Sequence, residues 1–462
     1  MRPLSIFGTS SDAGKSTIAL ALCKIFADMG YSVAPFKAQN MSNNACVCDD
    51  GGEIGVAQYA QAAMLGLPTS YHFNPILLKP QKDNESQVII NGKAAATQDA
   101  REYFKNIDTL KPVVNEAFGY LRERYDIVVC EGAGSPVELN LMEKDLSNVY
   151  TAREFGAKII LVADIERGGV FASVYGTYAL LPDDLKANVI GVIINKFRGD
   201  MTLFDEGRRI IEEQFGIPVL GVVPHIPFSV GYEDALSLSS YAKNNGSIKI
   251  AIIKYPHIAN FTDFEPLIMD KGLSVEFVER VQDLSVFDIV ILPGTKATIS
   301  DLRWFKSTGL FDEVRRCGAF VVGICGGYQM MFEMVCDPCG VESEAGSVET
   351  GFGYIDDEIL FEPAKTLAKG VYEYGGENLT GYEIHCGQSA KYPLFFESDG
   401  LFGTHLHGIF DNDGWRTAFL SRFDPAYNGY EFEAAKQREF ERLASSVKAH
   451  IAVEQIIKAL SC

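Results

Sequence analysis

The sequence predicts an α/β protein of two domains. Three observations support this: strand-length apolar runs alternate with helical patterns, a polar stretch interrupts the chain near its middle, and the alternation then restarts. Continuous apolar runs of this length are typical of strands buried on both faces of a parallel sheet that helices cover. We expect a first domain over residues 1–240 and a second over residues 248–462.

The first domain is predicted to be a mostly parallel sheet with helices on both faces. Its first strand is expected at residues 4–7, and apolar residues then recur at helical spacing from Ser16 until Gly30 ends the helix. Further strands are expected at residues 32–36, 126–130, 157–163, 189–194 and 219–223. The carboxyl ends of such strands share one sheet edge, where α/β proteins bind their ligands.

The second domain is predicted to begin after a polar linker at residues 240–247. Strands are expected at residues 248–253, 274–278, 289–292 and 320–324, and a helix is expected over residues 328–335. The second half is therefore expected to be an α/β domain of its own.

Composition argues against several classes of function. The 462 residues carry a formal net charge of −20, which disfavours non-specific binding to nucleic acid. No apolar run of about 20 residues could span a bilayer, so no membrane association is expected. No secretory leader precedes the first strand, so we expect the ten cysteines to be reduced in a cytoplasmic protein. Two cysteine pairs have spacings found in zinc sites but lack a histidine cluster: Cys46 with Cys48, and Cys336 with Cys339.

A glycine-rich loop, GTSSDAGKST at residues 8–17, joins the first strand to the first helix. Its backbone N–H groups can point at phosphate oxygens, and the helix N-terminus adds positive potential. Lys15 is expected to reach the β- and γ-phosphates of ATP, and Ser16 to ligate Mg²⁺. The predicted ATP-binding residues of this P-loop NTPase-like domain are Gly8, Thr9, Asp12, Ala13, Gly14, Lys15, Ser16 and Thr17.

The spacing within this loop indicates which class of P-loop protein it resembles. Five residues, rather than four, separate Gly8 from Gly14. In this respect the loop resembles that of dethiobiotin-synthetase-like P-loop proteins. The related partitioning ATPases carry an additional lysine early in the loop, where this chain has Ser10, so the resemblance does not extend to a positioning ATPase.

Two polar residues at strand ends are expected to complete the nucleotide site. Glu131 follows an apolar run, and an acid at this sheet edge is placed to hold Mg²⁺ together with Ser16. Asp126 begins the same strand and is expected to be a surface or capping residue. Asn195 follows the strand at residues 189–194, where its amide could recognise the nucleotide base; an ordinary loop role is the alternative.

The segment after the second strand is dense in amide and hydroxyl groups, which bind carboxylates and amides without carrying charge. Because the protein is acidic overall, an anionic substrate would need cations close to it. Ordinary turns and solvated charges are the alternative interpretation. The predicted substrate-binding residues are Lys37, Gln39, Asn40, Ser42, Asn43, Lys79 and Arg167.

Cys325 follows the last predicted strand and is flanked by glycines. Small neighbours are typical of a nucleophile on a strained turn between a strand and a helix. The N-terminus of the expected helix would favour the thiolate. The N–H of Gly326 and a second donor from Gly294, at the end of an earlier strand, are expected to form an oxyanion hole.

A thiol nucleophile needs a base. His405 and His407 would point to opposite sides of a strand, and we predict His407 to be the base. His385 is expected to shape the site. Many triad glutaminases place Glu two residues after the histidine, where this chain has Ile409. We therefore expect a Cys–His dyad whose third member is absent or comes from elsewhere in the chain.

Taken together, these motifs resemble the cobyric acid synthase family, whose second domain is class I glutamine amidotransferase-like. The resemblance covers essentially the whole chain. One departure is His405, where the family usually has Tyr. The sister a,c-diamide synthases carry a Gly-Pro-Asp-Tyr-type segment after the second strand in place of residues 39–44. The matching segments are residues 8–17, 36–44, 74–81, 163–164, 167–171, 260–264, 323–329 and 407–411.

The resemblance implies amidation that consumes one ATP and one glutamine at each step. The implied substrate is adenosylcobyrinic acid a,c-diamide, whose b, d, e and g carboxylates become amides to give adenosylcobyric acid. ATP would convert each acid to an acyl phosphate, which ammonia released from glutamine would attack. The expected cofactors are ATP and Mg²⁺, and the expected partners are glutamine and the corrinoid; the sequence carries no signal of oligomeric state.

Two other functions fit part of the pattern. One is a glutamine-dependent amidotransferase for another polycarboxylic acid, such as a cell-wall precursor. The other is a P-loop switch ATPase with an inactive glutaminase domain, which the intact Cys325 and His407 oppose. Glutaminase activity that depends on Cys325 would separate the switch ATPase from the two amidotransferases.

Overall fold

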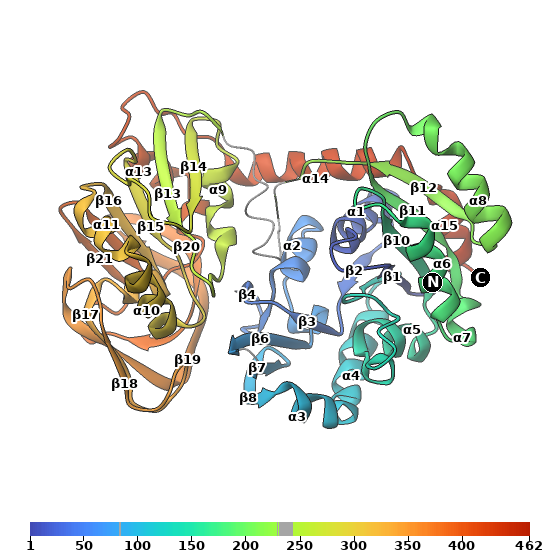
Figure 1. Cartoon of the computed structure of the whole chain (residues 1–462), viewed down its shortest axis with the longest axis horizontal. Coiled ribbons are helices and arrows are strands. Elements are labelled where there is room, and N and C mark those ends of the chain that lie inside the picture. The colour runs from blue at the N-terminus through green and yellow to red at the C-terminus, as the bar shows by residue number, and fades with distance from the viewer. Residues whose placement is uncertain (83–84, 229, 231–243) are drawn as a thin grey trace.

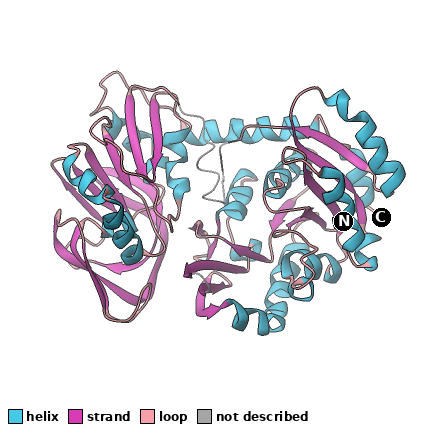
Figure 2. Ribbon diagram, viewed as in Figure 1, coloured by secondary structure: helices cyan, strands magenta, loops and turns pink. Residues whose placement is uncertain are grey.

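The computed structural model describes residues 1–82, 85–228, 230 and 244–462. Two lobes lie side by side, each with sheets covered by helices (Figures 1 and 2). The end of the predicted first domain, at residue 240, and residues 240–243 of the predicted linker lie outside the described residues. Within the described ranges, no helix is both long enough and apolar enough to cross a membrane.

A six-stranded sheet in the order β12-β11-β10-β1-β9-β2 forms the centre of the first domain. All neighbouring strands pair in parallel, and the apolar runs of the sequence form them, which confirms the predicted α/β class. The strands are β1 (Leu4–Gly8), β2 (Val33–Phe36), β9 (Ile127–Glu131), β10 (Lys158–Asp164), β11 (Val189–Phe197) and β12 (Val219–Pro224).

Helices cover both faces of this sheet. Ile6 of the central strand packs in a core with α1 (Lys15–Asp28), whereas Phe7 packs on the opposite face with α6 (Val170–Leu180). Successive side chains of a strand point to opposite faces, so one apolar run serves both cores. The remaining helices of this part are α4 (Lys111–Arg122), α5 (Thr151–Glu154), α7 (Asp183–Lys186) and α8 (Asp205–Phe215).

Strands that the sequence patterns did not reveal lie between the two lobes (Figure 1). A four-stranded sheet has the order β3-β6-β7-β8, and β4 pairs with β5 in a hairpin. The segment predicted to bind an acid therefore forms β3 and leads into β4. The elements are β3 (Gln39–Met41), β4 (Ala45–Val47), β5 (Glu53–Gly55), α2 (Val56–Met64), β6 (Ile76–Lys82), β7 (Glu85–Ile90), β8 (Lys93–Asp99) and α3 (Ala100–Lys105).

The second domain contains a six-stranded sheet in the order β14-β13-β15-β16-β22-β21. It is parallel except for β21, which pairs antiparallel with β22. Its elements are β13 (Ile248–Ile253), α9 (Glu265–Ile268), β14 (Leu273–Val278), β15 (Ile289–Leu292), α10 (Thr298–Thr308), α11 (Leu310–Arg316), β16 (Phe320–Ile324), β21 (Phe395–Ser398), β22 (Leu401–Thr404) and α13 (Asp413–Leu420).

The prediction of a helix over residues 328–335 is wrong. A single turn, α12 (Gly326–Gln329), is followed by β17 (Phe332–Asp337), which belongs to a second sheet with β18 (Ser347–Thr350), β19 (Ile355–Tyr374) and β20 (Glu377–Gln388). An unbroken apolar run is compatible with either a helix or a strand. Here residues 332–337 form a strand because they pair with β18 and β19.

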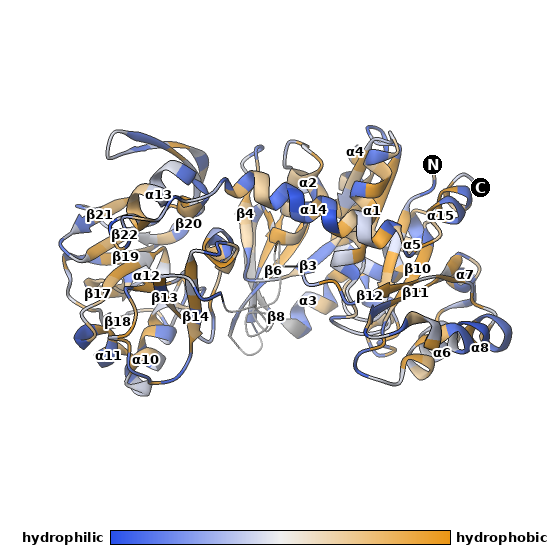
Figure 3. Ribbon diagram, turned by 90° about the horizontal axis from the view of Figure 1, so that it is seen from above, coloured by the Kyte–Doolittle hydropathy of each residue, from blue (hydrophilic) through white to orange (hydrophobic). Residues whose placement is uncertain are grey.

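The last two helices return to the first domain. α14 (Phe432–Lys448) spans the two lobes, and α15 (Val453–Leu460) ends beside the N-terminus (Figure 1). Figure 3, which colours the ribbon by hydropathy, shows both hydrophilic and hydrophobic residues along α14. Leu443 and Val447 are buried in the same core as α1. The expected second domain, residues 248–462, includes these helices, but their apolar side chains complete the core of the first domain.

Candidate active site

Cys325 lies on a sharp turn between β16 and α12. Its φ of 50° is a left-handed conformation that non-glycine residues rarely adopt. Neighbouring glycines make this turn possible: a Cβ added at Gly327 would lie 1.9 Å from the carbonyl oxygen of Leu292, and one at Gly326 would lie 2.9 Å from the nitrogen of Thr295. The turn therefore packs directly onto the end of β15, and one helical turn follows it instead of the expected longer helix.

Gly294, the predicted second oxyanion donor, lies next to both reactive side chains. A Cβ added there would be 3.5 Å from Cε1 of His407 and 3.7 Å from Cβ of Cys325. Gly326 follows the nucleophile directly. The structure brings both residues to Cys325, and donation from their N–H groups to an oxyanion stays a prediction.

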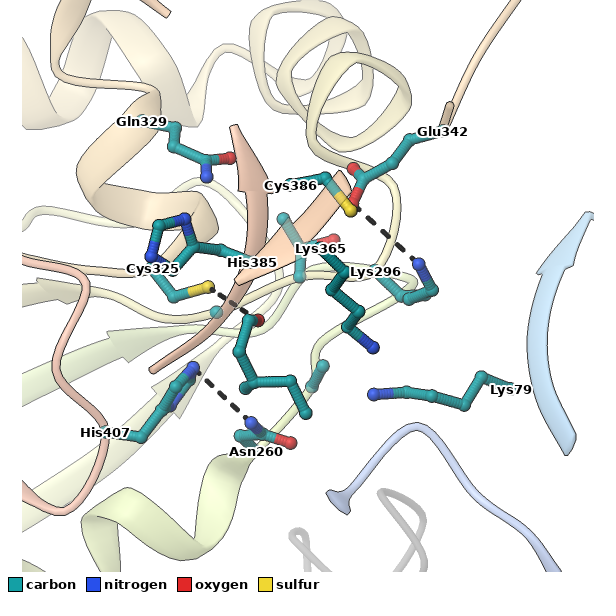
Figure 4. Close-up of a pocket in the computed structure, with 14 residues that line it drawn as sticks. Lys79, Asn260, Lys296, Cys325, Gln329, Glu342, Lys365, His385, Cys386 and His407 are labelled. Carbon is teal, nitrogen blue, oxygen red and sulfur yellow. Dashed lines mark hydrogen bonds and ion pairs between the residues drawn. The ribbon is translucent and has the colours of Figure 1, made fainter. Parts of the chain in front are cut away.

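His407 is buried beside Cys325 (Figure 4). Its Nδ1 lies 2.7 Å from Oδ2 of Asp263, and the other carboxylate oxygen of Asp263 accepts from the N–H of Gly408 at 3.0 Å. A carboxylate can only accept, so Nδ1 carries a hydrogen and Nε2 is left for proton transfer. Asn260 Nδ2 lies 3.4 Å from this Nε2.

Asp263 is the third member that the sequence analysis did not find. It lies in the short 3₁₀ helix Phe261–Phe264, 144 residues before His407. The position after His407 at which many triad glutaminases carry Glu holds Ile409, which is fully buried. The segment NFTDF matched the family, but only the fold shows that its carboxylate contacts the histidine. The predicted dyad is thus a Cys–His–Asp arrangement.

Charges around His407 favour its protonated form. Burial alone would lower the pKa of His407, but the charges of Asp263 and Cys325 and its hydrogen bonds to them raise the pKa to about 10. An imidazolium next to a thiolate is the activated form of a cysteine nucleophile.

We expect the stability that His407 contributes to depend on pH. Because its pKa is about 10 when folded and about 6.5 when unfolded, the contribution is complete below the unfolded value and is lost as the pH rises through the folded value. Denaturant unfolding of the wild type and of His407→Gln, compared between neutral and alkaline pH, measures this. The difference in unfolding free energy should shrink as the pH rises; a constant difference would contradict the raised pKa.

The other two histidines of this region pack against one another. The rings of His385 and His405 stack with centroids 3.9 Å apart, and Nδ1 of His405 lies 2.8 Å from the carbonyl oxygen of Pro393. Burial and the neighbouring His385 lower the pKa of His405, so this residue is neutral. His385 lines the pocket of Cys325, and its role in shaping the site stays a prediction.

The pocket at Cys325 is lined from both domains (Figure 4). Lys79 enters it from β6 of the first domain and pairs with Oε1 of Glu53 at 2.8 Å, while Lys365 of the second domain pairs with Oε2 at 2.5 Å. Burial lowers the pKa of Lys79 to about 8, against the attraction of Glu53. Lys79 was predicted to bind the acid substrate; the structure places it in the pocket of the nucleophile.

The same pocket contains a buried carboxylate and ammonium pair. Glu342 Oε1 lies 3.8 Å from Nζ of Lys296, and the hydroxyl of Thr298 donates to Oε2 of Glu342 at 3.3 Å. Burial raises the pKa of Glu342, which Lys296 opposes. Charges of both signs thus lie in the pocket of Cys325, which suits a zwitterionic amino acid.

The phosphate loop runs from β1 to α1, as predicted. Lys15 turns back over it, with Nζ donating to the carbonyl oxygen of Ser10 at 3.1 Å, and a Cβ added at Gly8 would lie 2.7 Å from this Nζ. The N–H of Thr9 donates to Val162 at 2.9 Å and so continues the pairing of the sheet, and Thr17 lies in the first turn of α1. The loop and its lysine are therefore held at the sheet edge where a nucleotide is expected.

Asn195 supports this loop from beneath. Its Nδ2 donates to the carbonyl oxygen of Ala13 at 3.0 Å. A Cβ added at Gly14 would lie 2.1 Å from this Nδ2 of Asn195. The amide nitrogen of Asn195 thus holds the backbone of the loop. Recognition of the nucleotide base by Asn195 stays a prediction. Arg167, expected at the acid substrate, also contacts the loop, because it pairs with Asp12 at 3.0 Å.

Glu131 lies at the centre of a buried polar cluster. Its Oε1 accepts from the hydroxyl of Ser16 at 2.7 Å and from Nζ of Lys37 at 3.0 Å, and its Oε2 accepts from Gln61 at 3.0 Å. Burial alone would raise the pKa of Glu131, but the charge of Lys37, with the hydrogen bonds from Ser16, Lys37 and Gln61, lowers it. The carboxylate is therefore ionised.

The donors at this cluster fit Mg²⁺. A hydroxyl and an ionised carboxylate side by side are the oxygen ligands this ion prefers, with phosphate oxygens and water completing its shell. Ser16 and Glu131 would hold it, as predicted from the sequence. Among the described residues, no group of three or more His, Cys, Asp or Glu side chains is arranged to hold a metal ion, and neither spaced cysteine pair is part of one.

The remaining residues of the expected acid site extend from this cluster toward the second domain. Asn40 donates to Gln58 at 3.2 Å, and the Gln39 side chain accepts from the hydroxyl of Tyr103 at 2.6 Å. Oδ1 of Asn43 is buried and has no hydrogen-bond partner among residues 1–82, 85–228, 230 and 244–462. With Lys37 and Ser42, these side chains form one continuous segment; Lys79 and Arg167 lie elsewhere.

Two family models match separate parts of the chain. Residues 4–236 match the model of the CobQ/CobB/MinD/ParA nucleotide binding domain. Residues 249–415 match the model of the CobB/CobQ-like glutamine amidotransferase domain. The phosphate loop falls within the first match, and Cys325, His407 and Asp263 fall within the second.

Several relatives match this chain over nearly its whole length. A cobyric acid synthase of Acinetobacter baylyi is 51% identical over 100% of this chain and 99% of its own length. A cobyric acid synthase of Chlorobium phaeobacteroides is 42% identical over 100% and 99%, and one of Geobacillus kaustophilus is 42% identical over 98% and 96%. Identity at this level over the whole length shows that the chain belongs to the cobyric acid synthase family.

Proposed function

We propose that the protein is a glutamine-dependent ligase that amidates the b, d, e and g carboxylates of adenosylcobyrinic acid a,c-diamide, giving adenosylcobyric acid. The observation that carries this proposal is the presence in one chain of the Cys325–His407–Asp263 arrangement and of a phosphate loop beside Glu131. The first can release ammonia and the second can activate an acid. The corrinoid substrate is supported by the relatives that share the full length of the chain.

The glutaminase half of the reaction follows from the geometry at Cys325. Its thiolate attacks the side-chain amide carbon of glutamine, and the N–H groups of Gly294 and Gly326 receive the oxyanion. Nε2 of His407 gives its proton to the leaving nitrogen, which releases ammonia and leaves a γ-glutamyl thioester. The same nitrogen then takes a proton from the water that hydrolyses the thioester to glutamate. Asp263 holds Nδ1 throughout.

The charged head of glutamine has partners in the same pocket. Glu342 would pair with the α-ammonium group, and Lys296 and Lys365 would pair with the α-carboxylate. Recognition of both charges would favour a free amino acid over a glutamine within a peptide.

The synthetase half requires activation, because ammonia does not displace oxide from a carboxylate at a useful rate. A carboxylate oxygen of the corrinoid attacks the γ-phosphorus of ATP in line, forming an acyl phosphate and releasing ADP. Ammonia then attacks the acyl carbon, and phosphate leaves. Lys15 and the loop N–H groups stabilise the charge on the transferred phosphoryl group. Mg²⁺ held by Ser16 and Glu131 would neutralise part of the triphosphate charge.

Mass spectrometry of the corrinoid tests the proposal. Purified protein is incubated with Mg-ATP, adenosylcobyrinic acid a,c-diamide and either glutamine or ammonium chloride, beside Cys325→Ala. We expect stepwise acid-to-amide mass changes with both nitrogen sources in the wild type. In Cys325→Ala the changes should vanish with glutamine, by a factor of about 10⁴ or more, and persist with ammonia.

Other outcomes assign the failure to one part of the proposal. Glutaminase activity without any amidation of the corrinoid would mean that the substrate is another polycarboxylic acid. ATP hydrolysis without glutaminase activity in the wild type would contradict the ligase and favour a switch ATPase. Amidation with glutamine that survives in Cys325→Ala would remove Cys325 as the nucleophile.

A further inference from the structure

A second cavity lies in the first domain, between strands β7 and β8 on one side and residues 103–110 on the other. Its volume is about 190 Å³. Val88, Tyr103 and Leu110 are buried and form its floor, whereas Ala95 and Asn106 are exposed at its mouth. Figure 1 shows β7, β8 and α3 beside β3 and β6, in the part of the first domain that carries the expected acid-binding segment.

The size and lining of this cavity suit a flat, neutral ring. An apolar cavity of about 150 Å³ can hold a benzene ring, so this one has room for a larger planar group. None of the described side chains that line it is charged, so an ionised carboxylate or phosphate would lose its hydration there without gaining a counter-ion. Tyr103 supplies an aromatic surface of the kind on which purine and pyrimidine bases stack.

The mouth of the cavity offers an amide. Asn106 begins the 3₁₀ turn Ile107–Leu110, and its side chain makes no capping bond to that turn. An Asn side chain can donate to and accept from the edge of an adenine ring at the same time. The cavity therefore combines an apolar floor with a polar group that distinguishes a purine from a hydrocarbon ring.

A hydrogen bond connects the cavity to the expected acid site. The hydroxyl of Tyr103 donates to Oε1 of Gln39 at 2.6 Å. Gln39 lies two residues after Lys37, and Nζ of Lys37 donates to Oε1 of Glu131 at 3.0 Å. Because two residues of chain span at most about 8 Å, a ligand as large as a corrinoid can occupy the cavity and still place a carboxylate beside Glu131.

The base of ATP is expected elsewhere. The phosphate loop follows β1, which has β10 and then β11 on one side and β9 and then β2 on the other. Asn195, where the base is expected, lies on β11, whereas the segment that leads to the cavity follows β2. An ATP molecule with its base at Asn195 thus leaves the cavity available to a second ligand.

We propose that this cavity binds the adenine ring of the axial adenosyl group of the corrinoid, with the base against Tyr103 and its edge at Asn106. The inference rests on the proposed function and adds a binding site for a part of the substrate that does not react. Adenine is a flat, neutral ring, whereas the side chains at the rim of the macrocycle are acids and amides. The axial bond passes through the centre of the macrocycle, so one anchor allows each of the four rim carboxylates to be turned toward Glu131.

Amidation with ammonium chloride tests the site without the glutaminase reaction. The substrates are adenosylcobyrinic acid a,c-diamide and the same corrinoid with cyanide in place of the adenosyl group. In the wild type, kcat/KM should be about 5- to 150-fold higher for the adenosyl form, the effect of one stacked base. Ala95→Trp places a large ring at the mouth of the cavity and should bring this ratio close to one, while kcat/KM for the cyano form stays within about twofold of wild type.

Ala94→Trp is the matched control. Ala94 is exposed on the same strand, but the cavity is lined by Ala95 and not by Ala94. This variant adds the same ring to the surface of β8 and should keep the wild-type ratio. Asn106→Ala should lower the ratio about fivefold or more, because the edge of the adenine loses its paired hydrogen bonds.

Binding of 5′-deoxyadenosine supplies an arm that needs no amidation. Equilibrium dialysis is carried out with Mg-ADP in excess, so that the nucleotide site is filled. We expect the wild type to bind 5′-deoxyadenosine and the adenosyl corrinoid to displace it. Ala95→Trp should weaken this binding about fivefold or more, and Ala94→Trp should leave it unchanged.

Three results would overturn the inference: equal kcat/KM for the two corrinoids in the wild type, an Ala95→Trp variant with the wild-type ratio, or no binding of 5′-deoxyadenosine beside Mg-ADP. Failure of the wild type to amidate either corrinoid with ammonia would instead remove the proposed substrate. In that case the binding of 5′-deoxyadenosine to Ala95→Trp and Ala94→Trp still decides whether the cavity holds a purine.

Discussion

Replacing Asp263 by Asn should lower glutamine-dependent amidation by a factor of about 10³ to 10⁴. The Asn amide can present its NH₂ group to Nδ1 of His407, which reverses the tautomer and leaves the wrong nitrogen protonated. It also removes the charge that favours the imidazolium. Steady-state rates of glutamate and amide formation, measured with glutamine, would show the loss in kcat more than in KM.

The same variant should amidate at nearly the wild-type rate with ammonium chloride, because Asp263 contacts His407 and Gly408 of the second domain, whereas the phosphate loop belongs to the first. Asp283→Asn is a matched control, since this carboxylate is exposed and bonds only its own turn among the described residues. Retention of glutaminase activity in Asp263→Asn would mean that His407 keeps its tautomer without the carboxylate. A loss with both nitrogen sources would indicate damage to the fold.

The second large effect is expected at Glu131. Glu131→Gln keeps the size of the side chain but removes the charge that meets Lys37, Ser16 and, by our proposal, Mg²⁺. Amidation should fall on the order of 10³-fold with glutamine and with ammonia alike, because activation of the acid precedes both. Unstimulated glutamate release should remain, which separates this variant from those at Cys325 and Asp263.

Removal of the charge also leaves the buried ammonium of Lys37 without its carboxylate, and breaking such a pair typically costs about 3–5 kcal/mol of unfolding free energy. Thermal unfolding of Glu131→Gln should therefore occur at a lower temperature. The double variant Lys37→Met with Glu131→Gln should recover much of the stability but none of the amidation. Recovery of amidation in the double variant would contradict a role for either residue in the chemistry.

Features that depend on a local pattern of residues could be predicted from the sequence. Buried parallel strands require unbroken apolar runs, so all strands of the first six-stranded sheet and β13 to β16 of the second could be placed almost to the residue, whereas β21 and β22 were not predicted. The phosphate loop was recognisable from its composition. β3 to β8 escaped because β3 to β5 have only three residues each, and β6 to β8 mix charged and polar residues with apolar ones, so none shows a clear apolar run. The apolar run of β17 fits a helix as well as a strand until its partners are known.

Within the candidate site, the sequence identified the groups that change bonds and missed those that place them. Cys325 and His407 stand in recognisable local settings. Asp263 meets His407 across 144 residues of chain, and Lys79 meets Lys365 through Glu53 across the domain boundary. Contacts of this kind are set by tertiary packing, so one sequence without its fold carries no signal for them.

The return of α14 and α15 to the first domain bears on the order in which the protein is made. The segment from Phe440 to Leu460, including Leu443, Val447 and Ile456, contributes to a core whose remaining buried residues lie between Leu4 and Val230. During synthesis that core stays open, with apolar surface exposed, until the final helices leave the ribosome. The glutaminase part can fold first, although it is encoded later than the phosphate loop. A nascent chain that stops short of residue 432 would thus carry an assembled glutaminase beside an unfinished synthetase.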